Sequence, residues 1–218
     1  MEILYCDNKI IVCVKPEGVL STDEPGGMPS LLRAALGEEN APIYTVHRLD
    51  AAVGGVMVYA RTRHAASDLG KAVESGAVDK TYLAVLRGVP GESAGTLRDL
   101  LRRDTRRGMT FVAPEPGQGV REAALEYETL AVRDGLSLVK IRLLTGRTHQ
   151  IRCQFSSRGL PLWGDRKYGL PGEEGPIALW SCSLRFVHPA AGEPMSFRKL
   201  PPEREPWTAF KEELWRQN

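Results

Sequence analysis

Two β-rich runs on either side of a tight-turn signal constrain the fold of this chain most strongly. Residues 124–132 and 136–144 are rich in aliphatic and β-branched side chains, and Arg133-Asp134-Gly135 joins them. An Asp-Gly pair between two such runs favours a β-hairpin. Because a hairpin makes its two strands antiparallel, the sequence predicts a fold built on an antiparallel sheet.

Further strand and helix signals alternate along the chain. Thr62 and Thr148 can each cap a helix, which Gly76 and Gly159 respectively would end. Residues 104–122 are rich in Arg, Gly and Pro and predict an exposed loop or a poorly ordered hairpin. Hairpins mixed with scattered helices are typical of an α+β fold. The other strand-like runs are 10–14, 53–59, 81–87 and 180–187, and the expected helices, with their caps and stops, are 31–37, 62–76, 148–159 and 207–216.

The composition is that of an ordinary globular protein. Hydrophobic residues make up 42% and charged residues 26% of the 218 residues, a chain length that can bury a substantial core. No apolar run approaches the ~20 residues of a membrane helix, and the N-terminus lacks the features of a secretion signal. The four cysteines form no CxxC pair, so neither a disulfide framework nor a zinc site is expected. We therefore expect a single domain over residues 1–218, located in the cytoplasm.

Positive charge is concentrated in two blocks of the sequence. The formal net charge is only +2, but residues 98–107 carry +3 and residues 140–167 carry +6, which leaves −7 for the rest of the chain. Such clustering is expected where one surface meets a polyanion. Two solvated basic faces would give the same pattern.

The segment His47-Arg48-Leu49-Asp50 carries the first candidate for chemistry. It lies between a β-rich stretch and Ala51-Ala52-Val53-Gly54-Gly55, which predicts that Asp50 lies in a loop. Two neighbouring cations would keep this carboxylate ionised at neutral pH. An ionised carboxylate can be a nucleophile, a general base or only an ion-pair partner, and these roles stay open.

Residues 143–152 (LLTGRTHQIR) form the second candidate. The pattern predicts a strand, a turn and a helix capped by Thr148, with Arg152 on the same helical face. Arg147 would lie just ahead of the helix N-terminus, where anions are favoured. This arrangement suits a phosphate or a buried carboxylate, and a capped helix with solvated arginines is the alternative. Tyr82, in the third candidate Lys80-Thr81-Tyr82, is either a core residue or a stacking platform for a flipped base.

Together with two further stretches, these segments resemble the RluA-type family of RNA pseudouridine synthases. The resemblance runs from about Leu4 to Phe197 and implies a mixed α/β catalytic domain with a bent antiparallel sheet and a central active-site cleft. It also implies isomerisation of uridine to pseudouridine in structured ribosomal or transfer RNA, without cofactor or metal, and we expect a monomer with no membrane partner. Because VKPEG begins at Val14, we expect no N-terminal RNA-binding domain. The matching stretches are VKPEG at 14–18, HRLD at 47–50, KTYLAVLRG at 80–88, LLTGRTHQIR at 143–152 and GLPLWGDRKYG at 159–169.

The resemblance assigns roles to individual residues. Asp50 matches the catalytic aspartate, Arg152 the arginine that pairs with it, and Tyr82 the tyrosine that packs against the target uracil. Arg48 matches a position that helps to hold the target base out of the RNA stack. The remaining candidates for substrate binding are His47, Arg147, His149, Arg106 and Arg107.

One departure from the family pattern leaves alternatives open. Relatives usually follow HRLD with two residues and then Thr-Ser-Gly, whereas this chain has Val53-Gly54-Gly55 and so lacks two hydroxyl groups beside the catalytic loop. A non-catalytic RNA-binding module of the same fold is therefore the main alternative. A hydrolase with Asp50 as nucleophile is the other, although most such enzymes need a second carboxylate.

Overall fold

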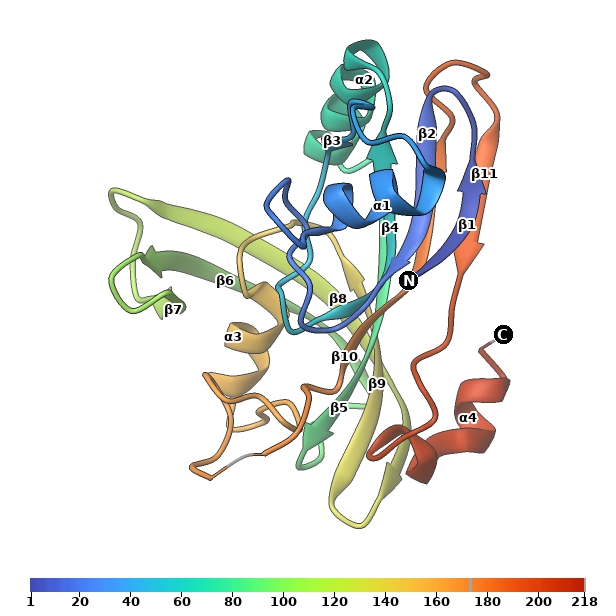
Figure 1. Ribbon diagram of the computed structural model, residues 1–218. Helices are drawn as coiled ribbons and strands as arrows, with labels where there is room; N and C mark the ends of the chain where they lie inside the picture. Colours follow the sequence, from blue (N-terminus) through green and yellow to red (C-terminus); the bar gives the residue numbers. More distant parts are fainter. Residues whose placement is uncertain (173, 218) are drawn as a thin grey trace. The chain divides into compact units, whose positions relative to one another are not determined.

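The computed structural model describes residues 1–172 and 174–217 and divides into two compact units (Figure 1). Unit 1 comprises Met1–Lys80 and Ser181–Leu200, and unit 2 comprises Thr81–Trp180 and Pro201–Asn218. Strands β5 (Asp79–Arg87) and β10 (Leu179–Val187) each contribute residues to both units. The single domain over 1–218 stays a prediction.

Unit 1 is a sheet with a helix packed on it. Its strands follow the order β1, β2, β4, β10, while β3 pairs with β4 and β11 with β10. Helix α2 begins at the expected cap, since Thr62 Oγ1 accepts the N–H of Ala65. The helix lies beside β4 (Figure 1), and its buried residues Ala65 and Leu69 belong to the aliphatic core of β2 and β4. The bounds are β1 Glu2–Cys6, β2 Ile10–Lys15, α1 Met28–Leu36, β3 Tyr44–Thr45, β4 Gly54–Ala60, α2 Arg63–Glu74 and β11 Pro194–Arg198.

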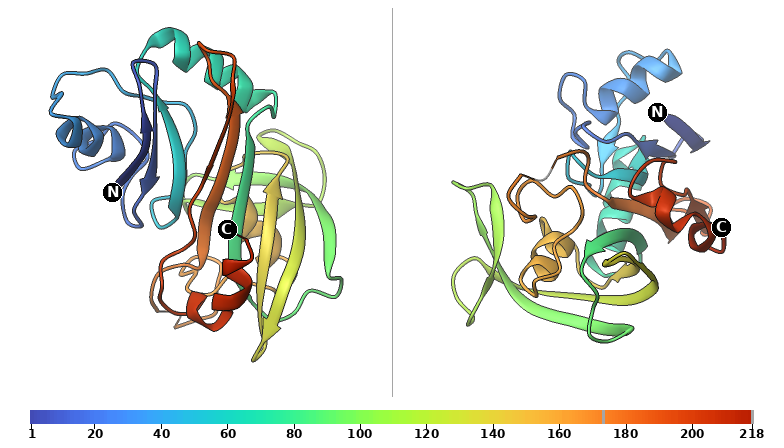
Figure 2. Two further views of the ribbon diagram at one scale, coloured as in Figure 1. Left: turned by 90° about the vertical axis from the view of Figure 1, so that its right-hand side faces the viewer. Right: turned by 90° about the horizontal axis from the view of Figure 1, so that it is seen from below.

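Unit 2 is a second antiparallel array with the strand order β5, β9, β8, β6, β7. The predicted hairpin is confirmed as β8–β9: Asp134 and Gly135 have φ of 51° and 74°, the left-handed backbone that an Asp-Gly turn supplies. Helix α4 lies beside this hairpin, where Arg133 Nη2 and Glu213 Oε1 are 2.7 Å apart (Figure 2). The bounds are β6 Ala94–Asp104, β7 Met109–Ala113, β8 Val120–Arg133, β9 Leu136–Leu143, α3 Gln150–Ser156, a 3-10 turn Trp207–Phe210 and α4 Lys211–Trp215.

The prediction that Thr148 caps a helix is wrong. Helix α3 begins at Gln150, and its N-cap is His149, which has a left-handed backbone (φ 54°) and no side-chain cap hydrogen bond. The Gln150 side chain organises the turn instead, because its Oε1 accepts both the Arg147 N–H and the Thr145 hydroxyl. Thr148 therefore lies outside the helix, and it does not share a helical face with Arg152.

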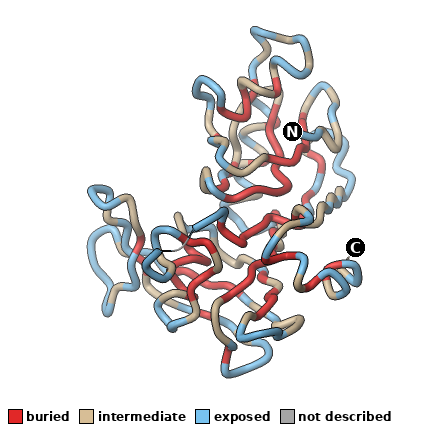
Figure 3. The backbone as a smooth tube through the Cα atoms, turned by 60° about the horizontal axis from the view of Figure 1, so that its bottom comes forward, coloured by how far each residue is buried: buried red, intermediate tan, exposed pale blue. Residues whose placement is uncertain are grey.

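Residues 104–122 are more regular than an exposed loop. They contain the β6–β7 turn, all of β7 and the start of β8, so the alternative of a hairpin is the better description. Buried residues, red in Figure 3, are concentrated in β2, β4, β5 and β10, whereas β1 and β11 contain none. The strand pairs with a described register are antiparallel, which agrees with the predicted α+β class.

Candidate active site

The loop that carries Asp50 is held by backbone hydrogen bonds on both sides of the carboxylate. Ser21 Oγ donates to Leu49 O (2.9 Å) and accepts the Leu49 N–H (3.1 Å), so one buried hydroxyl satisfies both backbone groups of that residue. Ala51 O accepts the Gly18 N–H (2.8 Å), and Val53 N–H donates to Asp50 O (2.9 Å). The main chain before and after Asp50 is thus anchored without use of the Asp50 side chain.

Lys15 is the second anchor of this loop, and it has no exposed surface. Its Nζ donates to three backbone carbonyls: Pro16 O (2.9 Å), Val19 O (2.5 Å) and Ala51 O (3.0 Å). Burial lowers the pKa of Lys15 to about 8, against the opposing influence of the carboxylates of Asp50 and Glu17. A buried ammonium group therefore lies within electrostatic reach of Asp50.

His47 and Arg48 differ in their exposure although they are neighbours. His47 is buried, and its Nε2 accepts the backbone N–H of Val58 at 3.1 Å. Burial, with the nearby charge of Lys80, lowers the pKa of His47 to about 3, so the ring is neutral at physiological pH. Arg48 is exposed. The loop thus presents Arg48 to solvent and uses His47 to hold β4.

In unit 2, Arg152 is one half of a buried ion pair. Its Nε donates to Asp165 Oδ2 (2.7 Å) and its Nη2 to Asp165 Oδ1 (2.6 Å). Burial alone would raise the pKa of Asp165, but the hydrogen bonds and charge of Arg152, with the N–H groups of Lys167 and Tyr168, hold that pKa below its ordinary value. The bidentate pair fixes the plane of the guanidinium group.

The other candidates of unit 2 occupy three segments. Tyr82 is on β5, directly opposite Ile141 of β9, and only 6% of it is exposed. Arg147 is exposed, and its Nε donates to Glu122 O (2.9 Å). Arg106 and Arg107 are exposed in the β6–β7 turn. The nearby ring of Phe111 has its centroid 5.9 Å from Cζ of Arg107, a cation–π contact.

The structure therefore brings His47, Arg48 and Asp50 together on one loop of unit 1, and Arg147, His149 and Arg152 into one segment of unit 2. Sequence reasoning missed the residues that hold these segments: Lys15, Ser21, Asp165 and Tyr168. The available signals were a lysine at the end of the apolar run Ile10–Lys15 and the Asp and Tyr of the stretch 159–169.

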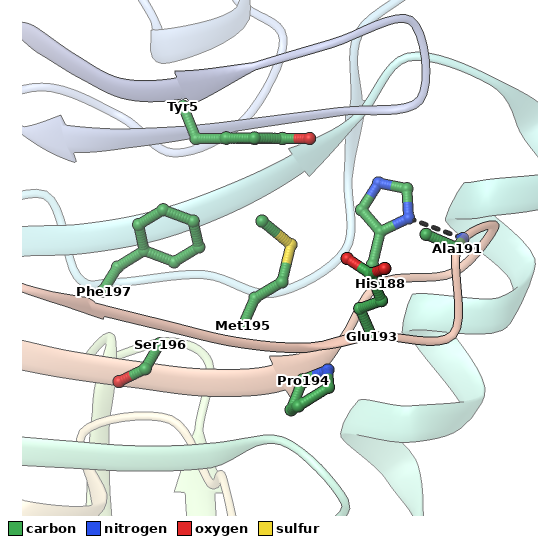
Figure 4. Close-up of a pocket in the computed structure, with 8 residues that line it drawn as sticks. All are labelled: Tyr5, His188, Ala191, Glu193, Pro194, Met195, Ser196 and Phe197. Carbon is green, nitrogen blue, oxygen red and sulfur yellow. Dashed lines mark hydrogen bonds between the residues drawn. The ribbon is translucent and has the colours of Figure 1, made fainter.

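One pocket of unit 1, of about 300 Å³, has none of the candidate residues in its lining (Figure 4). Its lining includes Tyr5, Met195 and Phe197, with His188 at one end. His188 Nδ1 accepts the N–H groups of Ala190 and Ala191 (3.2 and 2.9 Å), and its Nε2 lies 3.0 Å from Asp7 Oδ2. These contacts use both ring nitrogens of His188 in support of the surrounding chain.

Comparison with known proteins identifies the family. The model of the RNA pseudouridylate synthase family matches residues 9–157, which is more than half of the chain. The chain belongs to this family. Bacillus subtilis YjbO, an uncharacterized RNA pseudouridine synthase, is 32% identical over 212 residues that cover 93% of this chain and 73% of that protein.

Another relative agrees with this assignment, and two solved structures share the fold. An uncharacterized RNA pseudouridine synthase of Mycobacterium bovis is 34% identical over 207 residues, 88% of this chain and 66% of its own, so the chain spans just under two thirds of that relative. Human RNA Pseudouridylate Synthase Domain Containing 1 is 26% identical with a TM-score of 0.77, over 92% of this chain and 83% of the human chain. Human RNA Pseudouridylate Synthase Domain Containing 4 is 23% identical and has the same TM-score, over 99% of this chain and 92% of the human chain. The fold is that of the pseudouridine synthases, as the sequence predicts, and no helix in the described part of the chain is long and apolar enough to cross a membrane.

Proposed function

We propose that this chain isomerises uridine to pseudouridine in structured ribosomal or transfer RNA, with Asp50 as the catalytic carboxylate. The observation that carries the proposal is the Asp50 loop, which follows the family's HRLD pattern and is anchored by Lys15 and Ser21. A loop that is fixed before substrate arrives is what preorganised catalysis requires. We also propose that the protein works as a monomer in the cytoplasm.

The reaction breaks the bond from C1′ to N1 of uracil, turns the base, and joins C5 to C1′. C5 then loses its proton and N1 gains one, so that the product is an isomer of uridine. An ionised Asp50 can attack C1′ or accept a proton from the sugar, and both roles are compatible with this site. We assign Arg152, held by Asp165, as the cationic partner of the aspartate, in line with the resemblance. A fixed cation beside a carboxylate in a site that excludes water stabilises the ionised form.

The target base must first leave its stack, which costs a few kcal/mol. Arg48 is suited to stabilise the vacated position, because it is exposed on the same loop as Asp50. Tyr82 is assigned to pack against the flipped uracil, although its burial is equally compatible with core packing. Arg147 and His149, in the segment before α3, are assigned to the RNA backbone. His47 is assigned here as a support for the loop, because its ring is neutral and hydrogen-bonded to β4.

Incubation of the wild-type protein with unmodified cellular RNA tests the proposal. In the presence of a chelator and without added cofactor, we expect pseudouridine to form, with no release of free uracil. RNA binding without pseudouridine would support the non-catalytic binding module. Free uracil would support the hydrolase. Pseudouridine mapping in RNA from cells with and without the protein would then identify the modified uridine.

Arg106 and Arg107 should contribute affinity rather than chemistry, because both are exposed in a turn. Replacement of both by Ala is expected to weaken RNA binding and to reduce its salt dependence by up to about two phosphate contacts. The single-turnover rate at saturating RNA should stay unchanged. Binding titrations at several salt concentrations, paired with single-turnover assays, measure both effects. A large fall in the saturated rate with intact binding would contradict this assignment.

The lowered pKa of Lys15 predicts that the reaction rate falls on the alkaline side of its pH profile. As pH rises through the Lys15 pKa of about 8, the ammonium group loses the charge that faces Asp50, and the rate should fall. A loss of stability caused by deprotonation of Lys15 does not explain such a fall in rate. Its pKa in the folded protein lies below the ordinary 10.5, so between these values the unfolded chain binds more protons and stability rises with pH.

Lys15→Met tests the origin of this alkaline limb of the pH profile. The variant keeps most of the buried volume, but it should be destabilised by about 2–3 kcal/mol because buried carbonyls lose their donor. Its residual activity should lack the limb near pH 8. Rates from pH 6 to 10, with urea unfolding at each pH, measure both quantities, and an unchanged limb in the variant would assign it to another group.

A further inference from the structure

Tyr168 contacts the Arg152–Asp165 pair from two directions. The Tyr168 ring lies against the guanidinium group, with Arg152 Cζ 5.1 Å from the ring centroid. Its backbone N–H donates to Asp165 Oδ1 at 3.1 Å. Asp165 holds one edge of the guanidinium group and Tyr168 covers a face of it, so both residues restrict the direction in which Arg152 points.

The hydroxyl of Tyr168 is fixed to a different element. It accepts the backbone N–H of Thr110, the second residue of β7, at 2.6 Å, and it lies 2.9 Å from His149 Nδ1. Thr110 is buried, and its own hydroxyl donates to Thr148 O (2.9 Å). The ring that touches Arg152 is therefore tethered at its far end to the main chain of β7.

Two further contacts make this tether rigid. Lys167 Nζ donates to Gly108 O (3.0 Å), which ties the β6–β7 turn to the residue before Tyr168. Ser156 Oγ donates to Tyr168 O (2.8 Å), which ties Tyr168 to the end of α3. Tyr168 is thus held at its hydroxyl and at its backbone by separate elements of unit 2.

We propose that Tyr168 is a positioning residue for Arg152, with its hydroxyl anchored on β7 and its ring fixing the guanidinium group. The role of Arg152 in the reaction rests on the proposed function. Tyr168 does not need to touch RNA in this role. Its contribution should appear in the chemical step at saturating RNA and not in affinity, unlike that of the exposed Arg106 and Arg107.

Tyr168→Phe separates the anchor from the ring, because it keeps the cation–π face and removes only the hydroxyl. We expect the single-turnover rate at saturating RNA to fall about five- to tenfold, the rate equivalent of one lost hydrogen bond. RNA affinity should stay within about twofold, since the lost hydrogen bond holds Arg152 and not RNA. The rate of Tyr168→Leu, which also removes the ring, should fall further. Rates are expressed per folded protein from melting curves of each variant.

Tyr127→Phe is the matched control. Tyr127 is also in unit 2, and its ring also contacts helix α3, since its centroid is 5.6 Å from that of Phe155. Its hydroxyl donates to Glu92 O (3.3 Å), so Phe at this position keeps the ring contact with α3 and loses a hydrogen bond that does not involve the Arg152 segment. Loss of this hydroxyl should leave the saturated rate unchanged. A rate for Tyr168→Phe equal to that of the control would overturn the proposal and leave Tyr168 a structural residue.

A second measurement is independent of turnover. The measurement is an NMR spectrum of protein labelled with ¹⁵N-arginine. The Arg152 Nε–H signal is assigned as the one that is missing from the spectrum of the Arg152→Lys variant. Its hydrogen exchange should be slow in the wild type and in Tyr127→Phe, and faster in Tyr168→Phe. Unchanged exchange in Tyr168→Phe would overturn the positioning role even if the protein made no pseudouridine, whereas failure of the proposed function would appear in the wild-type assay alone.

Discussion

Replacement of Asp50 by Asn is expected to abolish pseudouridine formation and to leave the fold intact. The substitution keeps almost the same volume but removes the charge and the only carboxylate assigned to the reaction. Folding should survive because the loop is anchored through backbone atoms of Leu49 and Ala51, which Ser21 and Lys15 hold. Single-turnover assays at saturating RNA, with circular dichroism and melting curves, measure activity and folding separately.

RNA affinity provides the internal control for Asp50→Asn. Binding is assigned mainly to the basic residues and to Arg48, so it should be retained. Asp68→Asn is the matched variant, because Asp68 is on α2 of the same unit, where its Oδ2 lies 3.3 Å from His64 Nε2. Its substitution should leave the rate unchanged. Residual pseudouridine formation by pure Asp50→Asn protein would show that the chemistry belongs to another residue.

Local sequence signals predicted those parts of the fold that local chemistry determines. The β8–β9 hairpin follows from Asp134 and Gly135, both of which adopt the left-handed backbone. The start of α2 follows from Thr62, whose hydroxyl accepts the expected N–H. Strand β6 could not be predicted from the pattern, because Leu97, Leu100 and Leu101 have the i, i+3, i+4 spacing of a helix and not the alternation of a strand. Tertiary packing decides the outcome, since Leu101 packs with Ala123 and Cys153 of unit 2.

The motif residues of the site could be predicted, but the residues that support them could not. Asp50 and Arg152 stand in specific patterns, whereas Lys15 acts through Ala51, which is 36 positions away in the sequence. Asp165 acts through Arg152, 13 positions away. Such contacts leave no local periodicity in a single sequence. His47 shows the opposite case, because its position in HRLD suggests substrate binding while its contact with Val58 favours support of the loop.

Gly55→Ala is expected to be the most destabilising of the substitutions considered. Gly55 is in β4 with φ of 123°, a backbone conformation that other residues rarely adopt. A Cβ atom placed there would lie 2.2 Å from Ser181 O and 2.6 Å from Ser181 N, both backbone atoms of β10. Because backbone strain and a clash with main-chain atoms act together, we expect a loss of about 3–5 kcal/mol. Urea unfolding of the two proteins measures it.

Gly70→Ala is the matched control, because it makes the same chemical change in helix α2 of the same unit. A Cβ at Gly70 meets nothing within 4 Å, and Ala is the better helix former, so this variant should gain about 0.5–1 kcal/mol. The contrast bears on the departure from the family pattern. Val53 and Gly54 stand where the family pattern has Thr and Ser, but Gly55 keeps the glycine of that pattern, at a position where a side chain would collide with β10. A Gly55→Ala protein as stable as the wild type would mean that β4 and β10 do not approach this closely in solution.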